Sequence, residues 1–393
     1  MSGGLISLAK NNKAFYSLYY ILGTLFLRFL RFFVRPKPRL ILFVSYGGRQ
    51  YSDSPKAIYE EVLKDHRFDN FELVWAFREP EKIELPGRAR KIKIDSIPYY
   101  KIALGARVWI TNVAIERGLN FKGKHTFYLC TWHGSPIKKL WFDLKEHGAK
   151  VFVPKNPVNF DMLCAQSPYD VEVFSSAFRI DKSKIVMTGL PRNDVLVNPD
   201  ESIRRNTRRD LGIKDDQIMV LYAPTYRDYD LEEPIFHPML WDFKLDERFH
   251  VFFKGHHLGK NLKRRLNFPH VQRVPASIPL PDLMLASDIL VSDYSSVFFD
   301  YSILKKPIFC YAPDQELFAE KRGMYINPKD IFSEDFYFTN EEELIEAINN
   351  YDMNRPVFDT IKIKDNFVEV AGGSTGLFID ELVSRIKNFG IEL

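Results

Sequence analysis

The sequence predicts an α/β protein built from two doubly wound, Rossmann-like domains with parallel sheets. From residue 40 onward, short runs rich in β-branched and aromatic residues alternate with longer amphipathic stretches. Most of these runs are apolar throughout, as expected for parallel strands covered by helices on both faces. The 393 residues also suffice for two domains of roughly 150–200 residues each. We therefore expect each half of the chain to form one such domain.

The apolar runs fall into two sets. The first predicts strands of an N-terminal domain over 40–200, at 40–46, 71–77, 107–111, 126–130, 161–165 and 184–189. The second predicts strands of a C-terminal domain over 201–393, at 218–224, 249–254, 288–292 and 307–313, followed by an amphipathic helix over 376–390. In the polar joining stretch 195–216, the spacing of Arg204, Arg205, Arg208 and Arg209 is typical of a solvated helix face.

The composition is that of a packed globular protein. Hydrophobic residues make up 46% of the chain and charged residues 27%, and the formal net charge is only +4. This balance gives no case for nucleic-acid binding. The three cysteines, Cys130, Cys164 and Cys310, each end an apolar run, which predicts buried thiols rather than a disulfide framework.

Aromatic residues make up 15% of the chain, and many of them crowd into its first 43 residues. The uncharged run 14–27 is too short to span a membrane, and its positive charges lie mostly behind it, unlike those of a secretory signal. At helical spacing, residues 1–39 predict an amphipathic helix lying on an anionic membrane surface. The residues expected at this surface are Phe15, Leu22, Phe26, Arg28, Arg31 and Arg35. The alternative is a helix that packs on the protein's own core.

Ligands of doubly wound folds bind beyond the carboxyl ends of the strands, so we searched the loops there. In DILVSDYSSVFFDYSILKKPIFCY (288–311), the turn 293–296 separates a strand from a helix. The hydroxyls of Ser295 and Ser296, beside Asp293, predict an anion pocket suited to a pyrophosphate, and an ordinary helix cap is the alternative. Asp300 is placed to accept hydrogen bonds from a ribose or polyol, or to complement the helix dipole.

A second motif, CTWHGSPIKKLW (130–141), exposes a histidine directly after a strand. His133 has the titration range of a general base near neutral pH, and Gly134 allows close approach of a substrate. Ser135 and a helix opened by Pro136 follow. We expect a functional histidine here, against the alternative of a structural one.

Three further loops carry polar groups. Lys254, His256 and His257 of FFKGHHLGKN (252–261) can neutralise phosphoryl oxygens, and we expect no metal there because no cysteine or carboxylate accompanies the histidines at ligand spacing. LYAPTYRDYD (221–230) and TGLPRND (188–194) also follow strands. Their candidate site residues are Pro224, Thr225, Arg227 and Asp228 in the former and Arg192 in the latter.

In this order and at these separations, the five motifs resemble the CDP-glycerol glycerophosphotransferase family of teichoic-acid synthesis. The resemblance runs from about Val108 to about Tyr311. It implies a glycosyltransferase-B-like fold, His133 as the catalytic base and His256 as a second essential histidine. It also places Ser295 and Ser296 on the donor phosphates, and implies donor contacts by Arg192, Thr225, Lys254 and Asp300. Ser135 replaces a usual threonine, and the Gly255-His256-His257 context leaves open which histidine contacts phosphate.

The resemblance further implies what the protein acts on and where. The donor is CDP-glycerol, with no cofactor required, and the acceptor is a lipid-linked glycolipid of the undecaprenyl-diphosphate type. The reaction takes place at the cytoplasmic face of the cell membrane, with a peripheral enzyme that adds one unit or many, and an oligomer is left open. The alternatives are a nucleotide-sugar or CDP-ribitol transferase of the same fold, and a non-catalytic scaffold docked on the membrane.

Overall fold

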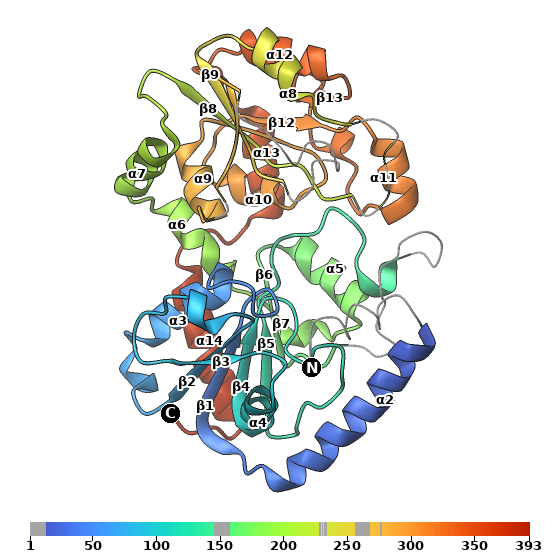
Figure 1. Cartoon of the computed structure of the whole chain (residues 1–393), viewed down its shortest axis with the longest axis vertical. Coiled ribbons are helices and arrows are strands. Elements are labelled where there is room, and N and C mark those ends of the chain that lie inside the picture. Colours follow the sequence, from blue (N-terminus) through green and yellow to red (C-terminus); the bar gives the residue numbers. More distant parts are fainter. Residues whose placement is uncertain are drawn as a thin grey trace. The chain divides into compact units, whose positions relative to one another are not determined.

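The structure, a computed structural model, describes residues 13–144, 158–227, 229, 231, 234–255, 268–275 and 277–393. They form two compact units (Figure 1). Unit 1 takes its described residues from Met1–His133, Phe152–Asp194 and Gly372–Leu393, and unit 2 from Gly134–Val151 and Val195–Ala371. The chain thus passes from unit 1 to unit 2 directly after His133 and again after Asp194, and it returns to unit 1 for the last time at Gly372.

Unit 1 contains a parallel sheet in the order β3-β2-β1-β4-β5-β6-β7. The strands are β1 (Lys37–Val44), β2 (Glu72–Phe77), β3 (Arg90–Lys93), β4 (Ala106–Thr111), β5 (Phe127–Cys130), β6 (Met162–Ala165) and β7 (Ile185–Met187). All six runs that predicted strands in this part of the chain are confirmed, whereas β3 was not predicted.

Helices cover both faces of this sheet, as the apolar runs predicted. The helices are α2 (Lys13–Leu30), α3 (Asp53–Val62), α4 (Ile97–Gly105), α5 (Pro168–Phe178) and the C-terminal α14 (Ser374–Asn388). Because side chains alternate along a strand, Phe43 and Trp75 lie on one face, in a core shared with α3 and α14. Trp109 and Tyr128 form the opposite core, together with Phe121. The three cysteines are buried and free, and burial raises the pKa of Cys164 to about 12.

Unit 2 contains a parallel sheet in the order β10-β9-β8-β11-β12-β13. The strands are β8 (Ile218–Tyr222), β9 (Phe249–Phe253), β10 (Val271–Arg273), β11 (Ile289–Ser292), β12 (Ile308–Tyr311) and β13 (Tyr337–Phe338). The helices are α7 (Glu201–Leu211), α8 (Pro238–Lys244), α9 (Leu280–Ala286), α10 (Val297–Ser302), α11 (Gln315–Arg322), α12 (Glu341–Asn349) and α13 (Phe358–Phe367), and α6 (Asp194–Val197) links the units. The four strands predicted here are confirmed, and β10 and β13 are additional.

The arginines of α7 are a correction to the sequence analysis. Arg205 and Arg209 are exposed as predicted, but Arg204 and Arg208 are not part of a solvated face. Both pair with Asp288, at 2.6 and 2.9 Å, and both donate to carbonyl oxygens at the end of α9. They satisfy C-terminal carbonyls that the helix itself leaves without partners.

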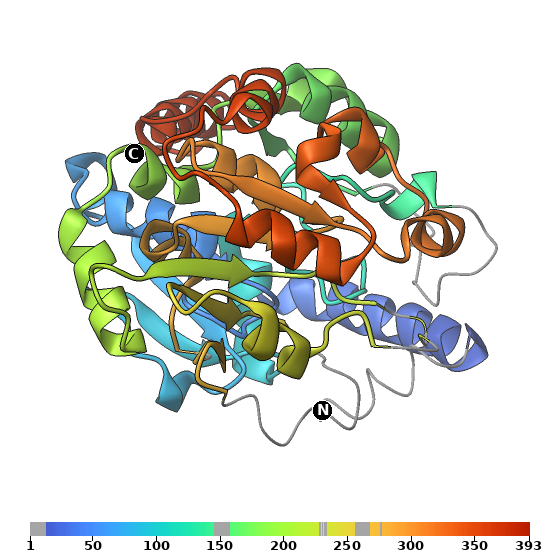
Figure 2. The same cartoon turned by 90° about the horizontal axis from the view of Figure 1, so that it is seen from above.

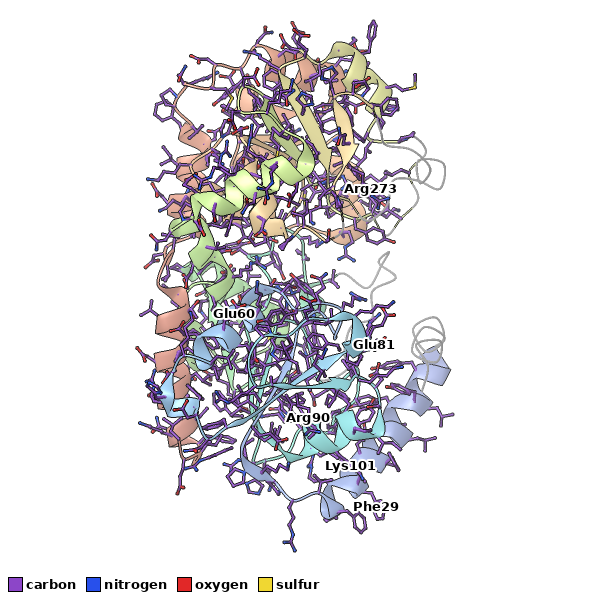
Figure 3. The ribbon with its side chains drawn as sticks, turned by 60° about the vertical axis from the view of Figure 1, so that its left-hand side comes forward. Phe29, Glu60, Glu81, Arg90, Lys101 and Arg273 are labelled. Carbon is purple, nitrogen blue, oxygen red and sulfur yellow. The ribbon has the colours of Figure 1, made fainter. Side chains whose placement is uncertain are left out.

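Helix α2 lies on the outside of unit 1, as Figure 1 and Figure 2 both show. Its polar stripe, not its apolar stripe, faces the protein: Thr24 is buried, and the side chains of Tyr16 and Arg28 donate to the carbonyl oxygens of Gly118 and Asn120. The exposed side chains of α2 and of the 3-10 turn Arg31–Phe33 that follows it include Leu18, Leu22, Leu25, Phe26, Phe29, Phe32 and Phe33. Figure 3 shows Phe29 pointing away from unit 1. Among the described helices, none combines the length and apolar character needed to cross a bilayer.

Candidate functional site

Each sheet has one point at which the strand order reverses, and the candidate residues gather there. In unit 1 the reversal lies between β1 and β4, and in unit 2 between β8 and β11. At such a point the loops leave their strands in opposite directions and open a crevice at the carboxyl edge.

In unit 1, His133 lies beside the loops that follow β1 and β4. Its Nδ1 is 2.9 Å from the carbonyl oxygen of Asn112, the residue directly after β4. A carbonyl oxygen can only accept a hydrogen bond, so Nδ1 is assigned as the donor and the lone pair lies on Nε2. The Asn112 side chain also accepts from the backbone N–H of Tyr46, at 2.8 Å, which ties the two loops together. His133 is therefore oriented as a general base requires.

Arg192, a predicted donor contact, lies in the same group of residues. Its Nη1 donates to the carboxylate of Asp53, at 2.8 Å, and both side chains are almost fully buried. Asp53 also accepts from the hydroxyl of Tyr46, at 2.5 Å, and from the backbone N–H of Ser54, at 2.6 Å. Burial by itself raises the pKa of Asp53, but these partners outweigh it and lower the pKa. Asp53 is thus ionised at neutral pH.

The backbone around His133 is strained. Tyr46, Asp53 and Trp132 have φ angles of +46°, +64° and +53°. Such left-handed conformations are uncommon for residues other than glycine and tend to persist at functional sites, where the surroundings hold them. Gly134, with φ +130°, follows His133 and adopts a conformation that few other residues tolerate.

In unit 2, Arg227 and Asp293 form the centre of a buried ion-pair network. The Arg227 guanidinium donates to Asp293 at 2.6 Å and to both carboxylate oxygens of Asp314 at 3.0 and 2.7 Å. The Arg227 side chain is only 5% exposed. Burial lowers the pKa of Arg227, but the two carboxylates outweigh it and raise the pKa overall. One guanidinium thereby joins the loops that follow β8, β11 and β12.

The hydroxyls of unit 2 flank this network. The backbone N–H of Thr225, which follows Pro224, donates to Asp293 at 2.8 Å, so the two loops at the reversal point are tied as in unit 1. Ser295 accepts from the N–H of Val297 at 3.3 Å, whereas the Ser296 hydroxyl makes no capping bond in the described structure. Asp300 is buried within α10.

The loop after β9 carries Lys254 next to Gly255. The Lys254 N–H continues the sheet by donating to the carbonyl oxygen of Tyr222, and its Nζ donates to that of Ile278 at 3.2 Å. Burial lowers the pKa of Lys254. A Cβ on Gly255 would lie 2.4 Å from the ring of Phe253, so a larger residue here would force that ring to shift. Asp228, His256 and His257 lie outside the described residues.

The segment after His133 belongs to unit 2. Ser135 is buried, and Lys139 and Tyr325 form backbone hydrogen bonds that join residues 137–139 to residues 323–325. The Tyr325 hydroxyl also donates to Asp143 at 2.5 Å. The motif 130–141 is therefore divided between the units, with residues 130–133 in unit 1 and residues 134–141 in unit 2.

Sequence reasoning missed four residues of these networks: Tyr46, Asp53, Asn112 and Asp314. A signal was present for the first two, because the predicted strand 40–46 ends at Tyr46 and the polar turn GGRQYSDSP (47–55) directly follows it. Asn112 and Asp314 also follow predicted strands but lie in no distinctive motif. Among the described residues, no three histidine, cysteine or acidic side chains gather as metal ligands.

Comparisons with known proteins point to one family. The sequence model described as CDP-glycerol:poly(glycerophosphate) glycerophosphotransferase matches residues 26–375. A teichoic acid poly(glycerol phosphate) polymerase of Staphylococcus epidermidis is 33% identical over 89% of the chain, which spans 51% of that relative. A polymerase of the same description from Bacillus spizizenii is 30% identical, with 88% of the chain and 92% of the relative covered.

A solved structure has the same fold. The wall teichoic acid polymerase TagF superimposes with a TM-score of 0.79 at 30% identity, and the match covers 96% of this chain and 98% of that one.

Proposed function

The chain belongs to the CDP-glycerol:poly(glycerophosphate) glycerophosphotransferase family, and we propose that it transfers glycerol phosphate from CDP-glycerol to a hydroxyl of a lipid-linked acceptor in teichoic acid synthesis. CMP is the other product. Membership of the family supports this activity, and the observation that carries the chemistry is the orientation of His133 by the Asn112 carbonyl oxygen. This hydrogen bond leaves Nε2 as the nitrogen that takes up a proton.

The reaction is a direct displacement at the β-phosphorus. His133 Nε2 accepts the proton of the acceptor hydroxyl as its oxygen forms a bond to phosphorus. The bond from that phosphorus to the bridging oxygen breaks, and the electron pair leaves with CMP. Lys254, His256 or His257, and the hydroxyls of Ser295 and Ser296 stabilise the charge that develops on the departing phosphate.

The ion-pair network of unit 2 supports a positioning role for two of the candidate donor-binding residues. Arg227 and Asp293 lie in loops that are expected to bind the donor, and the side chain of each is buried against the other. In our proposal they hold the loops of Thr225 and Ser295 in place, and the donor meets the hydroxyls and amides of those loops.

We further propose that α2 holds the enzyme peripherally at the cytoplasmic face of the membrane. Its exposed leucines and phenylalanines would otherwise face water, and Arg35 follows them on the exposed part of the chain. Anionic headgroups suit such cations, and the acyl boundary suits the rings. Arg28 and Arg31 contribute less to lipid binding in this view, because both already donate to backbone carbonyl oxygens of unit 1. A lipid-linked acceptor stays in the bilayer, so the enzyme has to come to it.

The test is an assay of the purified full chain with a defined lipid-linked acceptor. CDP-glycerol, CDP-ribitol and UDP-sugars are supplied separately, and CMP or UDP release is followed. We expect release of CMP from CDP-glycerol, and loss of turnover with little change in donor affinity in His133→Gln. Mass spectrometry of the product separates addition of one unit from polymerisation. Preferential release from another donor identifies a related transferase, and no release from any donor favours a scaffold.

A further inference from the structure

We propose that Asp53 is a positioning residue for His133, whose buried carboxylate stabilises the imidazolium that forms when His133 accepts a proton. The inference rests on the proposed role of His133 as the base. It concerns a residue that no sequence motif singled out and that lies on a different element, at the start of α3.

The surroundings of Asp53 fix its carboxylate in one place. The side chain is 5% exposed and accepts from Tyr46, Ser54 and Arg192 at 2.5–2.8 Å. The residue also adopts φ +64°, which a non-glycine residue rarely does unless its contacts require it. A surface carboxylate would gain little from such constraint. The burial, the three donors and the strained backbone together indicate that the negative charge of Asp53 is fixed in position for a functional role.

That charge acts on His133. The two side chains interact electrostatically, and the interaction with His133 is among the causes that lower the pKa of Asp53. Tyr46 lies between the two in the network: its hydroxyl donates to Asp53, and its ring lies 5.9 Å from the imidazole, centre to centre. Since coupling between two charges is reciprocal, the carboxylate favours the protonated imidazole by the same amount.

In the described part of unit 1, the charged or titratable groups coupled to Asp53 or His133 include Tyr46, Arg192 and Cys130, whose thiol stays neutral because burial raises its pKa. Tyr46 comes from the turn after β1, Asp53 from α3 and Arg192 from the 3-10 helix Pro191–Asn193. The positive charge of Arg192 disfavours protonation of His133, and the negative charge of Asp53, with which Arg192 pairs, offsets this effect. Asn112, after β4, orients the ring through a neutral carbonyl oxygen. Removal of the Asp53 charge alone therefore leaves the arginine unbalanced and lowers the pKa of His133.

The test compares Asp53→Asn with a matched control, Asp95→Asn. Asp95 also lies in unit 1, has φ +60° and pairs with a buried arginine, Arg117, at 2.8 Å, but none of its described contacts reaches His133. Asparagine tolerates the left-handed conformation at both positions, so each substitution removes one charge without a new backbone conflict. Thermal unfolding of both variants shows how much stability each ion pair contributes.

The decisive measurement is an NMR titration of the full chain labelled on its histidine rings, with the His133 signal assigned through His133→Gln. We expect the pKa of His133 to fall by about 1 unit in Asp53→Asn and by less than about 0.2 in Asp95→Asn. Tyr46→Phe removes a donor from the carboxylate and should raise the pKa by a few tenths, which gives a second reading if Asp53→Asn does not fold. An unchanged pKa in Asp53→Asn, an equal fall in both asparagine variants, or a fall in Tyr46→Phe overturns the proposal.

Kinetics provide a second readout. The acid limb of kcat/KM should move to lower pH by the same amount in Asp53→Asn, with a roughly 3- to 10-fold lower plateau because the base is weaker. The NMR titration needs no turnover. If the wild type releases no CMP from CDP-glycerol while the titration behaves as expected, the proposed function fails and the coupling of Asp53 to His133 stands.

Discussion

Replacing Phe26 and Phe29 of α2 with serine is expected to release the protein from anionic vesicles. These side chains are 62% and 61% exposed. A phenylalanine presents about 200 Å² of surface, so the pair offers about 240 Å² to lipid. At about 25 cal/mol per Å², full burial would contribute about 6 kcal/mol, and burial of half of this area at the acyl boundary about 3 kcal/mol. The double variant should therefore bind roughly 100-fold more weakly.

The assay is sedimentation of the full chain with vesicles of phosphatidylglycerol and phosphatidylcholine. The matched control is Phe243→Ser with Phe358→Ser, since these phenylalanines are 87% and 73% exposed on α8 and α13 of unit 2. The control should bind like the wild type, and wild-type binding should weaken as salt or the fraction of zwitterionic lipid rises. Equal binding of the α2 variant and the control would refute the reasoning.

Three further changes probe unit 2. Arg227→Lys keeps the positive charge but loses the paired hydrogen bonds to Asp314. We therefore expect the free energy of unfolding, measured by chemical denaturation, to fall by about 2 kcal/mol, and the KM for CDP-glycerol to rise. A change in kcat alone would contradict a positioning role. Burial raises the pKa of Asp314, but its bonds and charge pairing with Arg227 outweigh burial and lower the folded-state pKa below the unfolded value. The stability that this carboxylate contributes is therefore present above the unfolded pKa and is lost as the pH falls below about 4 towards the folded-state pKa. The melting-temperature gap between wild type and Asp314→Asn should close in that range, and a gap that widened would have the wrong sign. Gly255→Ala should lower the free energy of unfolding by about 1–3 kcal/mol, because the added Cβ would collide with the ring of Phe253. Gly376→Ala is the control: Gly376 lies in α14 with open space around it, so this change should leave the free energy of unfolding unchanged or raise it slightly.

The central strands were predictable, but of the four edge strands only β7 was predicted. Every predicted strand is confirmed, because a strand covered on both faces has to be apolar along its length. The three that were missed, β3, β10 and β13, all lie at sheet edges. β3 reads RKIK, with a single buried residue, and β10 reads VQR. Such short, polar edges resist pairing with other chains but carry no periodic signal.

Candidate site residues could be predicted where a polar side chain directly follows a strand within a distinctive motif. His133 was selected as a candidate in this way. Asp53 was missed because it lies nine residues beyond β1, and only folding of the intervening turn brings its carboxylate back to Tyr46. Arg227 illustrates the opposite difficulty, because it was predicted as a ligand-binding cation but pairs with the buried carboxylates of Asp293 and Asp314. The sequence alone does not show that Asp314 lies beside it.

The two units have the same hydrogen-bonding arrangement at the reversal point, where a ligand is expected. In each, a backbone N–H in the loop after the first strand of the reversal donates to a buried side chain in the loop after the other, Tyr46 to Asn112 and Thr225 to Asp293, both at 2.8 Å. A loop that leaves a sheet has to find new partners for its amides, and a buried polar side chain from the adjacent strand end supplies them. The bond also sets the separation of the two loops. The residues that bridge a reversal point therefore bear on ligand geometry even where they contact no ligand.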